Sequence, residues 1–122
     1  MITVMKKALL LLPAAAMAFA SPAQATGGLI CRTAGASPID VSLVIGHAAV
    51  STVVSARLTD NARGVPVRVA QAWIDANEVR LDLTDPQAMR HELRLVVRRR
   101  GNVYDGNLWR GGKRRWVRCR EG

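Results

Sequence analysis

Residues 91–121 have the sequence HELRLVVRRRGNVYDGNLWRGGKRRWVRCRE, which carries the clearest structural pattern in the chain. Apolar residues alternate with mainly polar ones over residues 93–98, the period-2 pattern of a half-buried β-strand. Gly101-Asn102 and Gly111-Gly112 then interrupt the pattern with residue pairs typical of two-residue hairpin turns. We therefore predict three consecutive antiparallel strands, with a type II′ turn at Gly101-Asn102.

These two turns predict a register in which Val97 faces Gly106 and Tyr104 faces Cys119. A slip by one residue would bury the arginines, so the pattern disfavours other registers. The residues predicted to point inward are apolar or small: Leu93, Leu95, Val97, Tyr104, Gly106, Leu108, Val117 and Cys119. The residues predicted to face solvent are mainly arginine and tryptophan: Arg94, Arg98, Arg100, Asp105, Trp109, Arg114, Trp116, Arg118 and Arg120.

The start of the chain is typical of a secretory signal peptide. Lys6 and Lys7 precede an apolar run, and Ala23-Gln24-Ala25 has the small–x–small form of a signal-peptidase site. A membrane anchor is disfavoured, because about 13 apolar residues interrupted by Pro13 are too few to span a bilayer. We predict cleavage after Ala25, export to the periplasm or the exterior, and a mature chain without a transmembrane segment.

Removing 25 of the 122 residues leaves 97, enough for one domain with a modest core over residues 26–122. Loss of the two leader lysines lowers the net charge from +9 to +7. Ten of the fifteen arginines lie in residues 90–120, so the positive charge is concentrated near the end of the chain. This distribution indicates an anionic partner, although solvated arginines also protect a sheet against aggregation.

The two cysteines, Cys31 and Cys119, lie near the two ends of the predicted mature chain. An even count in an exported protein predicts a disulfide. The bond would join the first strand to the last, and the chain-entropy model assigns roughly 4–5 kcal/mol to so long a loop.

The remaining residues predict further short strands separated by turns, with at most one helical turn after Asp85-Pro86. The fold class is therefore all-β, a single small antiparallel meander of about eight strands. Closure into a barrel, complete or nearly complete, is the favoured arrangement, and a β-sandwich is the alternative. In the strand before residue 75, alternate residues share one face: Val65, Val67, Val69, Gln71 and Trp73. Because most of this face is apolar, we predict that Trp73 lies in the core. Gln71, Trp73 and Tyr104 would line any hollow in the barrel.

The solvent face of the last strands is the candidate binding surface. Arginine forks suit phosphate and carboxylate groups, and exposed indoles stack on sugar or base rings. Asp105 is expected to neutralise Arg98 and Arg118 in part, and Arg94, Arg114 and Arg120 are expected to lack an acidic neighbour. The candidate binding residues are Arg94, Trp109, Arg114, Trp116, Arg118 and Arg120.

No assembled catalytic group is evident. His47 and His91 are the only histidines, and no sequence spacing places a serine, aspartate or cysteine beside either of them. We expect no enzymatic activity, no cofactor and no metal site.

The function predicted is a small exported binding protein that contacts an anionic envelope component. The candidate partners are an anionic glycan, a lipid phosphate and an acidic protein surface. The alternatives are a periplasmic inhibitor of a secreted enzyme, with only architectural similarity to small disulfide-closed inhibitors, and a purely structural envelope protein.

Overall fold

The computed structural model describes residues 26–47 and 51–122, so the predicted leader lies outside the described residues. The regular structure of these residues is entirely β, and no helix that could cross a membrane is found among them. The described residues form nine strands: β1 (Thr26–Thr33), β2 (Ile39–His47), β3 (Ser51–Asp60), β4 (Arg63–Val65), β5 (Arg68–Ile74), β6 (Glu78–Thr84), β7 (His91–Arg100), β8 (Val103–Arg110) and β9 (Lys113–Glu121).

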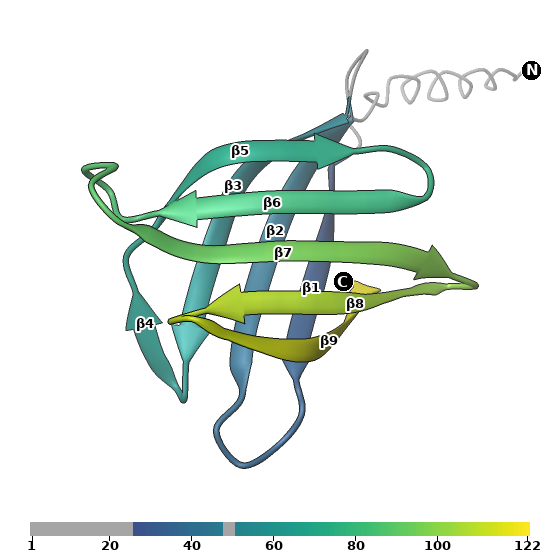
Figure 1. Cartoon of the computed structure of the whole chain (residues 1–122). Helices are drawn as coiled ribbons and strands as arrows, with labels where there is room; N and C mark the ends of the chain where they lie inside the picture. The colour runs from purple at the N-terminus through teal and green to yellow at the C-terminus, as the bar shows by residue number, and fades with distance from the viewer. Residues whose placement is uncertain (1–25, 48–50) are drawn as a thin grey trace, which may run out of the picture.

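All nine strands belong to one antiparallel sheet, in the order β4-β3-β2-β1-β9-β8-β7-β6-β5. The sheet curls into a half-barrel in which the layer β5–β9 crosses over β1–β3 (Figure 1). The two ends of the sheet, β4 and β5, are consecutive in the chain and are joined across Pro66. The predicted meander is confirmed. The count is nine because residues 63–65 pair with β3 as a separate short strand.

The predicted disulfide is confirmed, because Cys31 of β1 and Cys119 of β9 lie opposite each other and are bonded. It joins residues 88 positions apart and holds the first strand to the last at the middle of the sheet. The core surrounds this bond between the two layers. Its buried side chains are almost all aliphatic: Leu29, Val41, Leu43, Leu58, Val79, Leu81, Leu83, Leu93, Leu95, Val97, Leu108 and Val117.

The register predicted for the last three strands is confirmed at every pair named above. At the first turn Gly101 alone has a positive φ, 64°, as a type II′ turn requires. Gly111 and Gly112 both have positive φ, 60° and 76°, which is the type I′ pattern.

Two β-bulges change which side chains face the core. In β5 the pairing passes from Val69–Leu83 to Gln71–Asp82, so one extra residue reverses the face that follows. Trp73 is therefore 58% exposed, and its predicted core position was wrong. A similar shift in β3 buries Val53 and leaves Val54 exposed.

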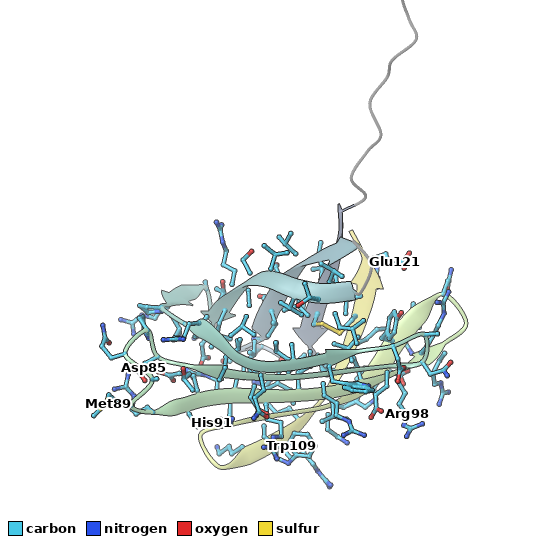
Figure 2. All side chains as sticks on the ribbon, turned by 90° about the horizontal axis from the view of Figure 1, so that it is seen from above. Asp85, Met89, His91, Arg98, Trp109 and Glu121 are labelled. Atoms are coloured by element: carbon cyan, nitrogen blue, oxygen red, sulfur yellow. A yellow bond between two sulfur atoms is a disulfide. The ribbon has the colours of Figure 1, made fainter. Side chains whose placement is uncertain are left out.

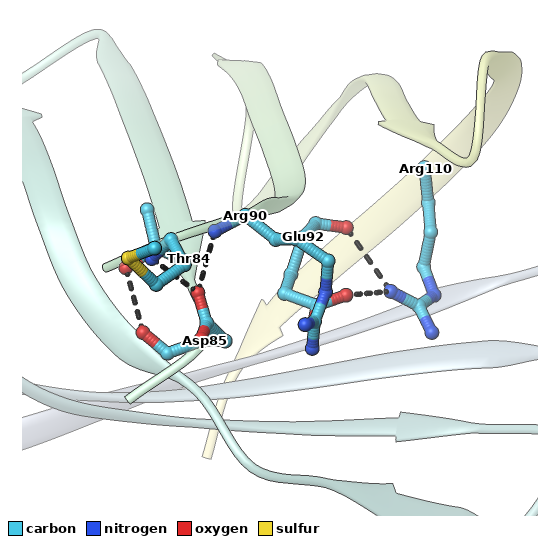
Figure 3. A network of polar contacts seen from close by, with 6 residues as sticks. Thr84, Asp85, Arg90, Glu92 and Arg110 are labelled. Carbon is cyan, nitrogen blue, oxygen red and sulfur yellow. Dashed lines mark hydrogen bonds and ion pairs between the residues drawn. The ribbon is translucent and has the colours of Figure 1, made fainter. Parts of the chain in front are cut away.

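The loop from Thr84 to His91 is built around the buried carboxylate of Asp85. Its Oδ1 accepts backbone N–H groups from Met89 and Arg90 at 2.7 and 2.6 Å (Figure 3 shows the Arg90 contact). Its carbonyl accepts the Ala88 N–H. The backbone hydrogen bonds that the Asp85 carboxylate accepts lower its pKa. The bond from Arg90 has the largest effect, and the bond from Met89 has a smaller one. These bonds form a tight loop without a helix, which agrees with the expectation of at most one helical turn there.

Arg110 connects this end of the layer to the other half of the sheet. Its Nε donates to Asp60 Oδ2 at 2.7 Å, and its Nη1 donates to Glu92 Oε1 at 2.9 Å (Figure 3 shows the Glu92 contact). Arg90 also donates to Glu92. Burial alone would raise the pKa of Glu92, but the hydrogen bonds from Arg110 and Arg90 outweigh it and lower that pKa.

Candidate functional site

The registers place the outward side chains of β5–β9 in rows that run across the strands. We call the solvent side of these five strands the outer face. Because directly opposed residues share a face, each row can be followed from strand to strand. The Trp109 row contains Gln71, Asp82, Arg94, Trp109 and Arg114. The Trp73–Trp116 row contains Trp73, Arg80, Val96, Asn107 and Trp116.

All six predicted binding residues lie on the outer face. Arg94 and Trp109 are directly opposed, and Arg114 continues their row (Figure 2 labels Trp109, with Arg98 and His91 on the same side). Trp116, Arg118 and Arg120 alternate along β9 with the buried Val117 and Cys119. The pattern of the last three strands thus places this set correctly, and its role in binding remains a prediction.

The acidic partners of the arginines differ from those expected. Arg94 has one, because its Nε donates to Asp82 Oδ1 at 3.0 Å across the β6–β7 pair. Asp105 lies 3.5 Å from Arg118 and 3.8 Å from Arg100, so the second arginine near it is Arg100 and not Arg98.

Arg114 and Arg120 are exposed and form no ion pair with any residue that the structure describes. Both lie on β9: Arg114 is near the turn at the start of the strand, and Arg120 is near its C-terminal end. The uncompensated positive charge that β9 contributes to the outer face is carried by Arg114 and Arg120. On β7, Arg98 is likewise exposed and forms no ion pair among the described residues.

His91 has an aspartate beside it, contrary to the expectation from spacing. Its Nε2 lies 2.9 Å from Asp82 Oδ1, the same oxygen that accepts the Arg94 hydrogen bond. Partial burial opposes ionisation of Asp82, but the hydrogen bonds from His91 and Arg94 outweigh it and lower the pKa of Asp82. The three side chains form a polar cluster next to Trp109, and His91, Arg94 and Trp109 line a shallow hollow.

Two indoles of the outer face are half exposed. Trp116 is 51% exposed, with the Arg118 guanidinium 5.2 Å from its ring centroid, close enough for a cation–π contact. Trp73 donates from its Nε1 to Asp75 Oδ2 at 3.1 Å, which fixes the orientation of its ring.

A cavity of about 690 Å³ lies over β5, β6 and β7 on the outer face. Gln71 and Trp73, expected to line the barrel interior, line this outer cavity instead, together with Arg80, Asp82 and Val96. Tyr104 does line a hollow of about 670 Å³, formed by both halves of the sheet near the two ends of the described chain. Sequence reasoning missed Trp73, Arg80 and Asp82 as outer-face residues, because their placement depends on the β5 bulge and the β6–β7 register.

Within residues 26–47 and 51–122, no group of three or more histidine, cysteine, aspartate or glutamate side chains is arranged to hold a metal ion. Comparison with protein-family models, curated proteins and solved structures finds no significant match to this chain. No relative therefore indicates a function, and the function proposed below is argued from the geometry of the outer face.

Proposed function

We propose that this chain is an exported, non-enzymatic binding protein whose outer face holds an anionic component of the cell envelope. The disulfide is consistent with an oxidising compartment. The lysine-flanked apolar leader pattern supports export. The observation that carries the proposal is that Arg114 and Arg120, which form no ion pair within residues 26–47 and 51–122, lie on the same face as exposed indoles.

The chemistry of this face suits an anionic ligand with flat apolar surfaces. An arginine without an acidic neighbour keeps all its N–H donors for a carboxylate or phosphate. Arg94 and Arg118 are already held by Asp82 and Asp105, so they contribute mainly to orientation. An indole adds contact area at a low cost in conformational entropy, because only two torsions have to be fixed.

The test is a titration of the purified protein with anionic probes at low and high salt. The probes are polygalacturonate, for an acidic glycan, and vesicles containing phosphatidylglycerol, for lipid phosphate. Binding to at least one probe is expected, with affinity falling as salt screens the charges. Replacing Arg114→Gln and Arg120→Gln together should weaken binding and reduce its salt dependence.

The matched control is the pair Arg57→Gln and Arg63→Gln, which removes the same charge from exposed positions on β3 and β4. Equal weakening by the two pairs would show that net charge and not the outer face controls binding, which contradicts the proposal. Salt-independent capture of a secreted enzyme with no binding to either probe would favour the inhibitor alternative.

A further inference from the structure

The Trp73–Trp116 row places one half-exposed indole at each end of a five-strand path. Four strand spacings separate the two residues, which corresponds to a path of about 19 Å measured along the curled sheet. Between them lie Arg80, Val96 and Asn107, a largely polar floor with one apolar position. The outer cavity covers the β5–β7 half of this path. A ligand that contacts both indoles must therefore be long and must cross the strands.

Both indoles are held in place before any ligand arrives. The ring of Trp73 is fixed by its hydrogen bond to Asp75, and Asp75 is in turn held by the backbone N–H groups of Asn77 and Glu78 at 2.8 Å each. Trp116 is in contact with the Arg118 guanidinium. Such preorganisation lowers the entropy lost on binding, which is a property expected of stacking subsites.

The polar groups along the path include both donors and acceptors. Asn107 offers an amide N–H₂ and a carbonyl oxygen, and Asp82 of the neighbouring row offers carboxylate oxygens beside the arginines. Sugar hydroxyls donate and accept, so they can use both kinds of group. A phosphate backbone only accepts, so it would leave acceptors such as the Asp82 and Asp105 carboxylates without a donor from the ligand.

The twist of the sheet also limits the ligand. At the usual rotation of about 20–25° between adjacent strands, the direction in which the side chains of the row point would turn through roughly 80–100° over its four steps. A stiff double helix would contact only part of such a row. A single flexible chain can follow it.

We propose that the ligand of the outer face is an acidic polysaccharide chain that crosses β5–β9 along this row, with sugar rings stacked on Trp73 and Trp116. Its carboxylates are bound by Arg114 and Arg120 on β9. This inference rests on the proposed function, because it names the ligand class and the path for the same surface.

The experiment is isothermal titration calorimetry of the protein with galacturonate oligomers from the dimer to the octamer. Affinity should rise with length until the oligomer spans the row and then level off. Trp73→Ala and Trp116→Ala should each lower the affinity for the octamer by roughly tenfold, the size expected for loss of one stacking contact. Trp73→Tyr should restore most of the binding, because it keeps an aromatic surface.

The matched control is Val54→Ala, which trims an exposed apolar side chain of β3, outside the outer face, and should leave affinity unchanged. A dimer that binds as tightly as the octamer, or a Trp73→Ala variant that binds like the unchanged protein, would overturn the path. Tighter binding of a single-stranded oligodeoxythymidylate than of the octamer would overturn the ligand class. If the octamer responds to the Arg114 and Arg120 changes but not to Trp73→Ala, this inference fails and the proposed function stands. If neither galacturonate nor phosphatidylglycerol vesicles bind, both fail.

Discussion

Gly106 is the position at which the smallest change should have the largest effect on the fold. It faces the core from β8, directly opposite Val97 of β7 and Val117 of β9. A Cβ at this position would overlap the Val96 carbonyl oxygen and would lie 2.9 Å from Val97 Cα and 3.1 Å from the Val96 carbonyl carbon. All three are backbone atoms, so no side chain can rotate to make room.

The expected cost of Gly106→Ala follows from this contact. Relief requires β7 and β8 to separate locally, which weakens the ladder at the centre of the layer. Overpacking of a core typically costs about 1–3 kcal/mol, and a backbone obstacle places this site at the upper end. Reduced freedom of the unfolded chain returns about 0.4–1 kcal/mol, so the net loss is about 2 kcal/mol. For a domain of this size that corresponds to a fall in Tm of roughly 8–16 °C.

Thermal and urea unfolding followed by circular dichroism measure this loss. Gly64→Ala is the matched control, because the same methyl group on β4 meets no atom within 4 Å. It should be neutral or slightly stabilising. The close approach of β7 and β8 would be refuted if Gly106→Ala changed the free energy of unfolding by less than about 0.5 kcal/mol, a quarter of the expected effect.

The other predictions concern the cross-links and the loop network. Replacing Cys31 and Cys119 together by alanine should lower the free energy of unfolding by about 4–5 kcal/mol, as the 88-residue separation implies, and a loss below about 1 kcal/mol would contradict this. Arg110→Met should cost about 2–3 kcal/mol at pH 7, because Glu92 and Asp60 lose a shared charged donor, and urea unfolding measures this. The lowered pKa of Glu92 means that its ionised form stabilises the fold above the ordinary glutamate pKa of about 4.3, and that this contribution is lost as the pH falls through the lowered value. The unchanged protein should therefore lose more stability on acidification below that pH than Arg110→Met does, and equal losses would show that Arg110 does not set the pKa of Glu92.

The sequence was sufficient to predict the last three strands because two-residue turns leave almost no freedom in pairing. With Gly101-Asn102 and Gly111-Gly112 fixed, every opposed pair of β7, β8 and β9 follows by counting. The disulfide was predictable from the position of Cys31 and Cys119 at the two ends of the domain.

The position of Trp73 was not predictable in the same way. Val69, Ala70, Gln71 and Ala72 contain two alanines, which fit either face, so the alternation gives no sign of the extra residue between Val69 and Gln71. The bulge reverses the following residues, and the outer face gains an indole that the pattern assigned to the core.

The Asp82 contacts were missed for a related reason. His91 and Arg94 reach Asp82 only because β6 and β7 pair in a register set by the long loop around Asp85, with a further irregularity between Leu83 and Thr84. Loop length alone does not fix such a register, since the loop is shaped by hydrogen bonds to a buried carboxylate.

The most direct test of the outer face as a binding surface is an NMR titration of the ¹⁵N-labelled protein with the galacturonate octamer. The account predicts that the indole N–H signals of Trp73 and Trp116 and the amide signals of β5–β9 shift together. Shifts confined to the residues around Tyr104, or to β2 and β3, would contradict it.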